Sequence, residues 1–352
     1  MKLSDFDYNV PKELIAQYPA DARDAARMLV LDRKSGEISH KKFSAFPDFV
    51  KREDILVLND TKVINVRLVG RRVTGGKTEI FLTEKIQNRI YKALLKPSSM
   101  IRERDEVFFD NSDMKVRILA KKEANNVVEF IYPGPDLDKE LARIGSVPLP
   151  PYVKRSAEPL DKDRYQTVYA KEEGATAAPT AGLHFTKEIL GRVKGQGSRT
   201  AYITLHVNYG TFAPVKSEDI TKHKMHSEEF KLGESAADEI NRVKTTGGRV
   251  FAVGTTSVRV LEACVVPDTR VTGYPGTRDM VEPKNGKTDI FIYPPHKFKI
   301  VDALLTNFHF PKSTLLMLVS AFAGRELILK AYEEAIKERY RFFSYGDCML
   351  II

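Results

Sequence analysis

The stretch RVFAVGTTSVRVLEA, residues 249–263, decides the fold, because an apolar run passes through one glycine directly into a helical pattern. Arg249–Val253 is predicted to be a strand. Gly254–Ser257 supplies a glycine and three hydroxyl residues, and a helix runs from Val258 to Ala263. Strands that alternate with helices in this way are typical of a layered α/β domain.

More strands are expected on both sides of this segment. In Arg199–Val207 the apolar residues occupy every second position, so one face of that strand is apolar. Near the N-terminus, an apolar run that ends in Asn59 is interpreted as one more strand of the same sheet. The expected strands beyond 249–253 are Asp54–Leu58, Arg199–Val207, Asp289–Tyr293 and Ile300–Leu305.

Helix signals separate these strands. One helix is expected to start at Ser235, where Asp238 completes a weak capping box, and to end near Gly247. Another follows Pro311 and is expected to be capped by Ser313 or Thr314.

The segment from Val66 to Tyr132 has a different pattern. Short strands follow one another with turn residues between them and without helical periodicity, which favours a small antiparallel sheet or barrel. The proline-rich stretch from Val147 to Tyr152 is interpreted as the return linker. We therefore predict an α/β fold: a layered α/β catalytic domain (1–65 and 148–352), with a mixed sheet and flanking helices, carrying an inserted small antiparallel β-barrel domain (66–147).

The composition is that of a folded, basic protein. Of 352 residues, 42% are hydrophobic and 29% charged, which argues against disorder. The formal net charge of +9 favours an acidic partner such as nucleic acid. Cys264 and Cys348 do not form a disulfide framework, the N-terminus lacks a signal peptide pattern, and Leu315–Phe322 is too short to cross a bilayer. We expect a soluble cytoplasmic protein with no membrane association.

Polar residues follow four of the expected strands. In open α/β sheets ligands bind beyond the carboxyl ends of the strands, so four such ends together favour a convergent site. These residues are Asn59, Asp60, Thr61, His206, Gly210, Thr211, Gly254, Thr255, Thr256, Ser257, Asn307 and His309.

The turn Gly254–Ser257 could bind a carboxylate or a phosphate, because a helix start leaves backbone N–H groups pointing at a ligand. It matches neither a Walker loop nor a dinucleotide fingerprint. A helix cap without a ligand is the equal alternative. Further along the helix, Arg259 and Glu262 are expected to pair with each other, as residues three apart commonly do.

Two further segments carry candidate groups. Ala178–Thr186 is almost uncharged and contains Thr180, Gly182 and His184, and its small residues permit close approach of a ligand. The alternative for His184 is a buried histidine with a satisfied hydrogen bond, and Thr186 is expected to cap the next helix. A titratable cluster comprises His223, His226, Glu228 and Glu229. For this cluster acid/base or ligand-binding use is favoured over a metal, and a solvated loop remains open for His223.

Taken together, the motifs resemble one family closely, the S-adenosylmethionine:tRNA ribosyltransferase-isomerases of queuosine biosynthesis. The resemblance covers nearly the whole chain, in order. The matching stretches are LNDTKVINVRL from Leu58, IGSVPLPPY from Ile144, RYQTVYA from Arg164, APTAGLHFT from Ala178, HKMHSEEF from His223, AVGTTSVRVLE from Ala252, LLTNFHFPKSTLLMLVSAFAG from Leu304 and YRFFSYGDCML from Tyr340. Departures from the family pattern occur at Asn208-Tyr209, Asn65-Val66 and Cys348.

The resemblance implies a specific reaction. The ribosyl part of S-adenosylmethionine is transferred and isomerised onto 7-aminomethyl-7-deazaguanine at the tRNA wobble position. The product is epoxyqueuosine, and adenine and methionine are released. S-adenosylmethionine is then a consumed substrate, with no cofactor and no metal, and the partner is tRNA that carries 7-aminomethyl-7-deazaguanine.

The roles expected from the matched motifs are as follows. The reaction needs a base at the 5′-carbon beside the sulfonium, an acid for the leaving adenine, and a deprotonated RNA amine. The acid/base candidates are His184, His226 and His309, with Glu228 or Glu229 as the competing base. The substrate-binding candidates are Asn59, Asp60, Thr61, Thr180, Gly182, His206, Gly210, Thr211, Gly254, Thr255, Thr256, Ser257, Arg259, Asn307 and Asp347.

Two other functions stay open on sequence grounds: a different S-adenosylmethionine-dependent RNA-modifying enzyme, such as a methyltransferase, and a non-catalytic RNA-binding protein. Either the basic residues of the insert or the rim of the α/β domain could bind tRNA. We expect a monomer, although no pattern in the sequence specifies an oligomeric state.

Overall fold

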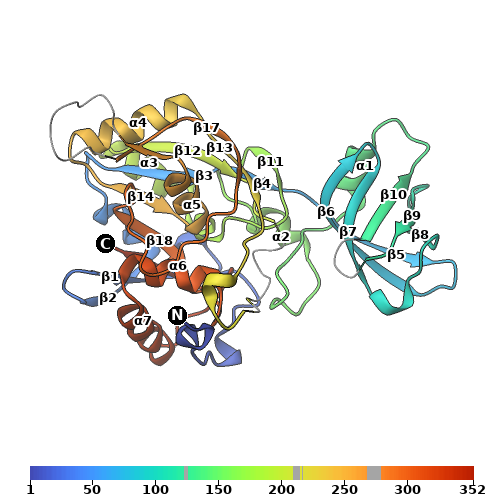
Figure 1. Cartoon of the computed structure of the whole chain (residues 1–352), viewed down its shortest axis with the longest axis horizontal. Helices are drawn as coiled ribbons and strands as arrows, with labels where there is room; N and C mark the ends of the chain where they lie inside the picture. Colours follow the sequence, from blue (N-terminus) through green and yellow to red (C-terminus); the bar gives the residue numbers. More distant parts are fainter. Residues whose placement is uncertain (123–125, 209–214, 216, 268–278) are drawn as a thin grey trace.

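The computed structural model describes residues 1–122, 126–208, 215, 217–267 and 279–352. A large α/β body carries both chain termini, and a smaller barrel projects from one side of it (Figure 1).

The α/β body is built on a mixed sheet, which has nine strands within the described ranges. Its centre is parallel, because β12, β3, β14 and β18 run in the same direction, and antiparallel strands flank this centre. The sheet order is β17 (Lys284–Thr288), β13 (Glu228–Leu232), β12 (Arg199–Leu205), β3 (Ile55–Asn59), β14 (Val250–Val253), β18 (Ala303–Asn307), β19 (Cys348–Ile351), β1 (Arg27–Leu31) and β2 (Ile38–Lys42).

Alternate residues of the central strands enter two different hydrophobic cores, because successive side chains of a strand point to opposite faces. In β3, Ile55 and Val57 pack in the first core, and Leu56 and Leu58 pack in the second. The first core is covered by α4 (Glu234–Thr245), α5 (Thr255–Ala263), α6 (Thr314–Ala323) and α7 (Arg325–Lys337); the second is covered by the 3₁₀ helix η4 (Phe43–Phe49) and by α3 (Lys187–Gly195).

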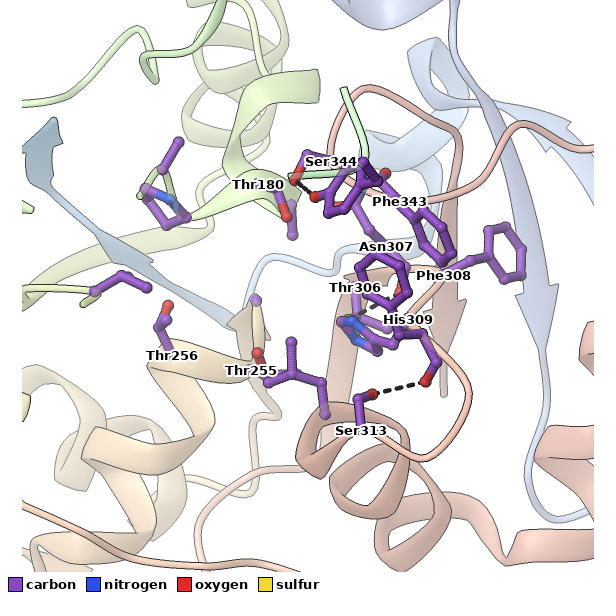
Figure 2. A pocket seen from close by; sticks show the side chains of 18 of the residues that line it. Thr180, Thr255, Thr256, Thr306, Asn307, Phe308, His309, Ser313, Phe343 and Ser344 are labelled. Carbon is purple, nitrogen blue, oxygen red and sulfur yellow. Dashed lines mark hydrogen bonds between the residues drawn. The ribbon is translucent and has the colours of Figure 1, made fainter. Parts of the chain in front are cut away.

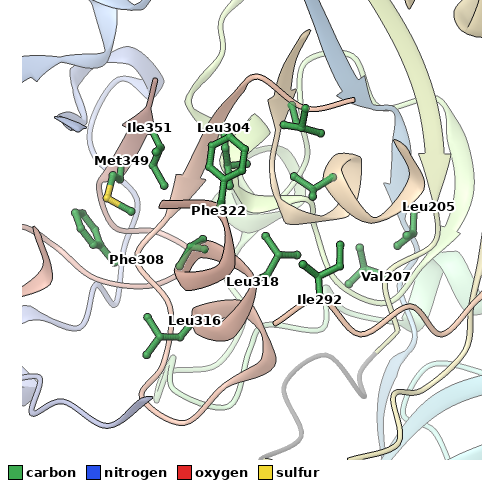
Figure 3. Packing of buried hydrophobic residues seen from close by; sticks show 14 of the residues in the cluster. Leu205, Val207, Ile292, Leu304, Phe308, Leu316, Leu318, Phe322, Met349 and Ile351 are labelled. Carbon is green, nitrogen blue, oxygen red and sulfur yellow. The ribbon is translucent and has the colours of Figure 1, made fainter. Parts of the chain in front are cut away.

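Figure 3 shows the first core, in which Leu316, Leu318 and Phe322 of α6 pack in one cluster with Leu304 of β18. Ser313 caps α6 by accepting a hydrogen bond from the backbone N–H of Leu316, as predicted. None of the helices in the described ranges is long and apolar enough to cross a membrane.

The barrel is closed and antiparallel, and six strands form it in the described part of the chain. This confirms the predicted fold class, and all six strands fall inside the range predicted for the insert, 66–147. The domain boundaries themselves stay a prediction. The barrel order is β10 (Asn126–Ile131), β7 (Ile90–Lys96), β6 (Lys77–Gln87), β5 (Arg67–Arg72), β8 (Glu106–Phe108) and β9 (Lys115–Ala120).

Shorter elements connect these units. Two small pairs of strands, β4 (Thr61–Val63) with β11 (Glu172–Ala175) and β15 (Val265–Pro267) with β16 (Asp279–Val281), lie outside the main sheet and the barrel. The remaining helices are α1 (Leu137–Ile144), α2 (Pro159–Arg164) and the 3₁₀ turns η1 (Leu3–Phe6), η2 (Lys12–Leu14), η3 (Arg23–Ala25), η5 (Ser98–Met100), η6 (Thr180–His184) and η8 (Ile220–Lys222).

Two strand predictions were wrong: one strand is absent, and the other begins later than predicted. Residues 289–293 form no strand, because the pairing with β13 ends at Thr288 and the apolar side chains that follow leave the sheet to pack against the first core. The strand predicted from Ile300 begins only at Ala303, since the backbone N–H groups of residues 299–301 donate to the carboxylate of Glu262.

The predicted Arg259–Glu262 pair was also wrong. The Glu262 carboxylate accepts from the backbone N–H groups of residues 299–301, and Arg259 pairs with Glu228 instead. The predicted capping box at Ser235 is absent too. Helix α4 begins at Glu234, and Gly233 occupies the N-cap position. Glycine has no side chain that could accept a hydrogen bond there.

Candidate functional site

A cavity of about 370 Å³ lies at the carboxyl ends of the central parallel strands. Its walls come from the segments that follow β14 and β18, from the loop before η6, and from two stretches distant in sequence, 151–154 and 343–344. In Figure 2, Thr255 and Thr256 lie on one side of the view, with Asn307 and His309 on the other. This volume is within the range of small-molecule sites. The structure therefore brings two of the four polar strand ends together.

The first wall is the start of α5. Gly254 has a φ of +87°, a left-handed conformation that favours glycine, and it turns the chain from β14 into the helix. No side chain caps the helix, so its first N–H groups stay available to a ligand. The Thr256 hydroxyl is buried and has no hydrogen-bond partner among the described residues. Ser257 differs, because its hydroxyl donates back to the carbonyl of Val253.

The opposite wall is the end of β18. The side-chain amide of Asn307 donates to the carbonyls of Phe343 (3.1 Å) and Asp347 (3.3 Å). Its Oδ1 is buried without a partner in the described part of the chain, and Asn307 lines the cavity. His309 also lines the cavity, and its Nε2 lies 2.7 Å from the Thr306 hydroxyl. This wall thus presents an amide oxygen and an imidazole.

An aromatic cluster, consisting of Tyr152, Phe310 and Phe343, forms a third wall. The rings of Phe310 and Phe343 are stacked with centroids 3.8 Å apart, and Tyr152 lies 4.8 and 5.1 Å from them. The Tyr152 and Ser344 hydroxyls are hydrogen-bonded (Figure 2). The sequence did not predict these residues as part of the site, because none of the three is a polar residue at the end of an expected strand. The available signal was their presence in three of the matched stretches.

Burial determines the protonation of the two central histidines. Burial, and secondly the positive charges of Arg23 and Arg341, lower the pKa of His184 from 6.5 to about 3. Burial alone lowers the pKa of His309 to about 3. Both imidazoles are therefore neutral near pH 7, and one ring nitrogen of each can accept a hydrogen bond.

His184 does not line the main cavity. Its Nε2 faces the Nδ2 of Asn307 at 3.3 Å, and its ring packs against Phe43. His184 lines a separate small cavity together with Arg23. Asn307 therefore connects His184 to the main cavity. Thr186 caps α3 as predicted.

A second cavity, of about 360 Å³, contains other predicted residues. His206 lines it, and its Nδ1 lies 2.8 Å from the Thr61 hydroxyl. Val207 lines the main cavity instead, because neighbouring side chains on an extended chain point to opposite faces. Burial lowers the pKa of His206. The structure therefore separates this strand end from the main cavity.

Asp60 and Asn59 support this second region. The Asp60 carboxylate accepts a hydrogen bond from the Thr204 hydroxyl at 2.7 Å, and burial raises the pKa of Asp60. The Asn59 side chain bonds to both backbone groups of Leu205 and to the N–H of Thr61. These contacts hold β3 and β12 together at their carboxyl ends.

The predicted titratable cluster is divided between the interior and the surface. Glu228 is buried, and its carboxylate accepts hydrogen bonds from the Arg259 guanidinium and from the backbone N–H of Asn208 (2.9 Å). Glu229 is exposed and pairs with Lys287 at 3.3 Å. His226 is exposed and is not among the residues that line the main cavity. Arg259 therefore faces Glu228, and neither of the two lines the main cavity.

Three other predicted residues have different surroundings. Thr180 lines the main cavity. Gly182 does not, and a β-carbon there would collide with the Tyr169 hydroxyl. The Asp347 carboxylate accepts hydrogen bonds from the backbone N–H groups of Arg27 and Arg341, both at 2.8 Å. Gly210 and Thr211 lie outside the described residues. Within the described ranges, no group of three or more His, Cys, Asp or Glu side chains could hold a metal ion.

Comparison with known proteins identifies the family. A model of the family described as "Queuosine biosynthesis protein" matches residues 3–351. The S-adenosylmethionine:tRNA ribosyltransferase-isomerases of Acetivibrio thermocellus and Sulfurihydrogenibium sp. are each 50% identical to this chain in alignments of 353 residues, which cover 100% of this chain and 100% of each relative. The crystal structure of the S-adenosylmethionine tRNA ribosyltransferase from Thermotoga maritima is 36% identical, with a TM-score of 0.53, covering 99% of this chain and 100% of that one. With its whole length matched in this way, the chain belongs to the queuosine biosynthesis protein family.

Proposed function

We propose that this chain is an S-adenosylmethionine:tRNA ribosyltransferase-isomerase. It transfers and isomerises the ribosyl part of S-adenosylmethionine onto 7-aminomethyl-7-deazaguanine at the tRNA wobble position. The products are epoxyqueuosine in tRNA, free adenine and free methionine. The observation that carries this proposal is the full-length similarity, at 50% identity, to relatives with that name.

The main cavity supports the proposal, because its walls suit the parts of S-adenosylmethionine. The uncapped start of α5 is positive in character and suits the methionine carboxylate. The rings of Tyr152, Phe310 and Phe343 offer flat apolar surface for the adenine. The free Oδ1 of Asn307 can accept a hydrogen bond from a ribose hydroxyl or from the RNA amine.

His309 is our first choice for the base that removes the proton from the 5′-carbon. It is the histidine that lines the main cavity among the three histidine candidates, so a substrate bound there can come within its reach. His184 does not line the main cavity and contacts it only through Asn307, whose side-chain amide faces the His184 Nε2. We assign His184 to positioning Asn307. The ion pair with Arg259 leaves Glu228 a weaker candidate for the base.

We further propose that S-adenosylmethionine is consumed as a substrate and is not a resident cofactor, that no metal takes part, and that the enzyme acts as a cytoplasmic monomer. In every turnover the ribosyl part of S-adenosylmethionine then stays on the tRNA, and its adenine and methionine parts are released.

Product analysis tests the function. The purified protein is incubated with S-adenosylmethionine and with tRNA that carries 7-aminomethyl-7-deazaguanine, and the products are quantified by mass spectrometry. We expect adenine, methionine and epoxyqueuosine in equal amounts, and none of them with tRNA that has guanine at the wobble position. S-adenosylhomocysteine without adenine would instead identify a methyltransferase, and tRNA binding without either product a non-catalytic protein.

Two variants then test the base. His309→Gln should lower turnover at least about 100-fold, as is typical for the loss of a general base. His226→Gln, on the exposed segment outside the cavity, should retain most of it. The opposite ranking would place the base on the 223–228 segment.

A further inference from the structure

A second, smaller groove adjoins the main cavity. It has a volume of about 240 Å³ and lies between the outer surface of the barrel and the segment that returns to the α/β body, residues 149–156. Pro151 and Lys154 line both the groove and the main cavity. A chain bound in the groove would therefore lie next to whatever occupies the main cavity.

The barrel wall of the groove carries an unpaired positive charge. Glu79 of β6 and Lys96 of β7 are direct cross-strand neighbours, but the Glu79 carboxylate pairs with Arg67 at 2.7 Å. The Lys96 side chain is exposed, and its ammonium group has no ion pair or hydrogen bond among the described residues. The charge of Lys96 thus remains available to a partner.

The opposite wall adds two more cations. Asp161 holds Arg155 in place through two hydrogen bonds of 2.7 and 2.8 Å, and the Arg155 guanidinium lies 4.0 Å from the centre of the Tyr18 ring. The Lys154 ammonium group is exposed and donates only to the carbonyl of Pro151 among the described residues. Four cationic side chains therefore line the groove: Arg67 and Arg155 are paired with Glu79 and Asp161, whereas Lys96 and Lys154 have no ion pair among the described residues. The groove also has apolar lining residues, which include Phe81, Leu94 and Val153.

Elsewhere on the barrel, Lys77, Arg102, Arg104 and Lys122 are exposed without an ion pair among the described residues, but none of them lines the groove, and several other basic side chains are paired. Lys92 pairs with Glu84, and Lys115 and Arg117 both pair with Glu106. Lys85 pairs with Asp138, and Arg71 lies 3.8 Å from Asp110. A groove with apolar lining residues and unpaired cations matches a nucleotide, because its base and ribose can pack on the apolar residues while its phosphates meet the cations.

We propose that this groove binds the tRNA strand next to the wobble nucleotide, with Lys96 and Lys154 on the phosphates that flank it. This inference rests on the proposed function, since it assumes that the modified base enters the main cavity. Sequence-specific enzymes read single-stranded RNA loops from splayed nucleotides, and such a nucleotide needs its backbone held beside the pocket. The groove adjoins the main cavity, and one of its walls comes from strands β5, β6 and β7 of the barrel, which projects from the α/β body (Figure 1).

Charge reversal at Lys96 tests the proposal, because Lys96 lines the groove but not the main cavity. Binding of an unmodified tRNA transcript is measured by fluorescence anisotropy between 50 and 300 mM KCl. Lys96→Glu should weaken binding roughly three- to tenfold at 100 mM salt, and should reduce the slope of log K against log salt by about 0.7, the value for one phosphate contact on a single strand. Lys96→Gln removes the same phosphate contact, so it should change the slope by about the same 0.7, and it should weaken binding less than Lys96→Glu because it adds no repulsion.

Lys122→Glu is the matched control. Lys122→Glu changes the net charge by the same amount as Lys96→Glu. Lys122 is exposed and follows β9, which lies opposite β6 in the barrel order, so the charge changes away from the groove. Its tRNA affinity should stay within about twofold of the wild type, and the affinity of both variants for S-adenosylmethionine should be unchanged by calorimetry.

The outcomes separate the two proposals. If the wild-type protein releases adenine but Lys96→Glu binds tRNA as the wild type does, or if Lys122→Glu weakens binding equally, the groove assignment is overturned and the proposed function stands. If the wild-type protein binds the transcript but releases no adenine with substrate tRNA, the proposed function is overturned and the assignment of the groove to wobble-flanking nucleotides is overturned with it.

Discussion

The burial of His184 predicts a specific dependence of stability on pH. Its pKa is lowered from 6.5 to about 3 in the folded protein. Because the unfolded chain binds the proton more tightly, the folded state loses stability as the pH falls from about 6.5 towards 3. Below pH 6.5 the loss is about 1.36 kcal/mol for each pH unit, so it amounts to about 2 kcal/mol between pH 7 and pH 5.

The variant His184→Gln isolates this contribution. Glutamine does not titrate, and its amide oxygen can accept the hydrogen bond that Nε2 now accepts from the Asn307 amide. At pH 7 the variant should be less stable than the wild type, because its shape does not match the aromatic surroundings near Phe43. At pH 5 the gap between variant and wild type should be smaller by about 2 kcal/mol.

Urea unfolding at pH 7, 6 and 5 provides the measurement. Thr186→Ala serves as the control, since it removes the cap of α3 next to His184 without changing a titratable group. Its cost, about 1 kcal/mol, should be the same at the three pH values. A His184→Gln gap that stays constant within about 0.5 kcal/mol from pH 7 to pH 5 would refute the assignment of a buried neutral imidazole.

Three other substitutions have defined expectations. Glu228→Ala leaves the buried Arg259 guanidinium without its carboxylate, so urea unfolding should show a loss of about 3–5 kcal/mol; a loss below about 1 kcal/mol would contradict the structural role of the pair. Thr256→Val removes a buried hydroxyl that has no partner in the described chain, so calorimetry should show S-adenosylmethionine binding about three- to tenfold weaker with the folded state no less stable. If affinity is unchanged, the hydroxyl does not contact the substrate. Gly182→Ala places a β-carbon against the Tyr169 hydroxyl and should lower the unfolding free energy by about 1–3 kcal/mol, unless a melting curve like that of the wild type shows that the loop adjusts.

Local patterns in the sequence predicted the four central parallel strands of the main sheet and the presence of the barrel, but not the five outer strands of the sheet, β1, β2, β13, β17 and β19. The alternation in Arg199–Val207, the turn at Gly254 and the cap at Ser313 depend on residues close together in the chain, and the structure confirms all three. The apolar run 289–293 was misinterpreted, because burial against a core and pairing in a sheet select the same residue types.

The sequence by itself determined the family, the fold class and the charge that favours RNA, because these depend on long motifs, on periodicity and on composition. Only the tertiary structure decided which strand ends share a cavity. His206 and Val207 are neighbours in sequence, yet they line different cavities, since extended backbone sends successive side chains to opposite faces. Likewise, Arg259 pairs with Glu228, 31 residues away, because α5 packs beside β13. Contacts of this kind depend on how the layers pack, and the local sequence around each residue does not encode them.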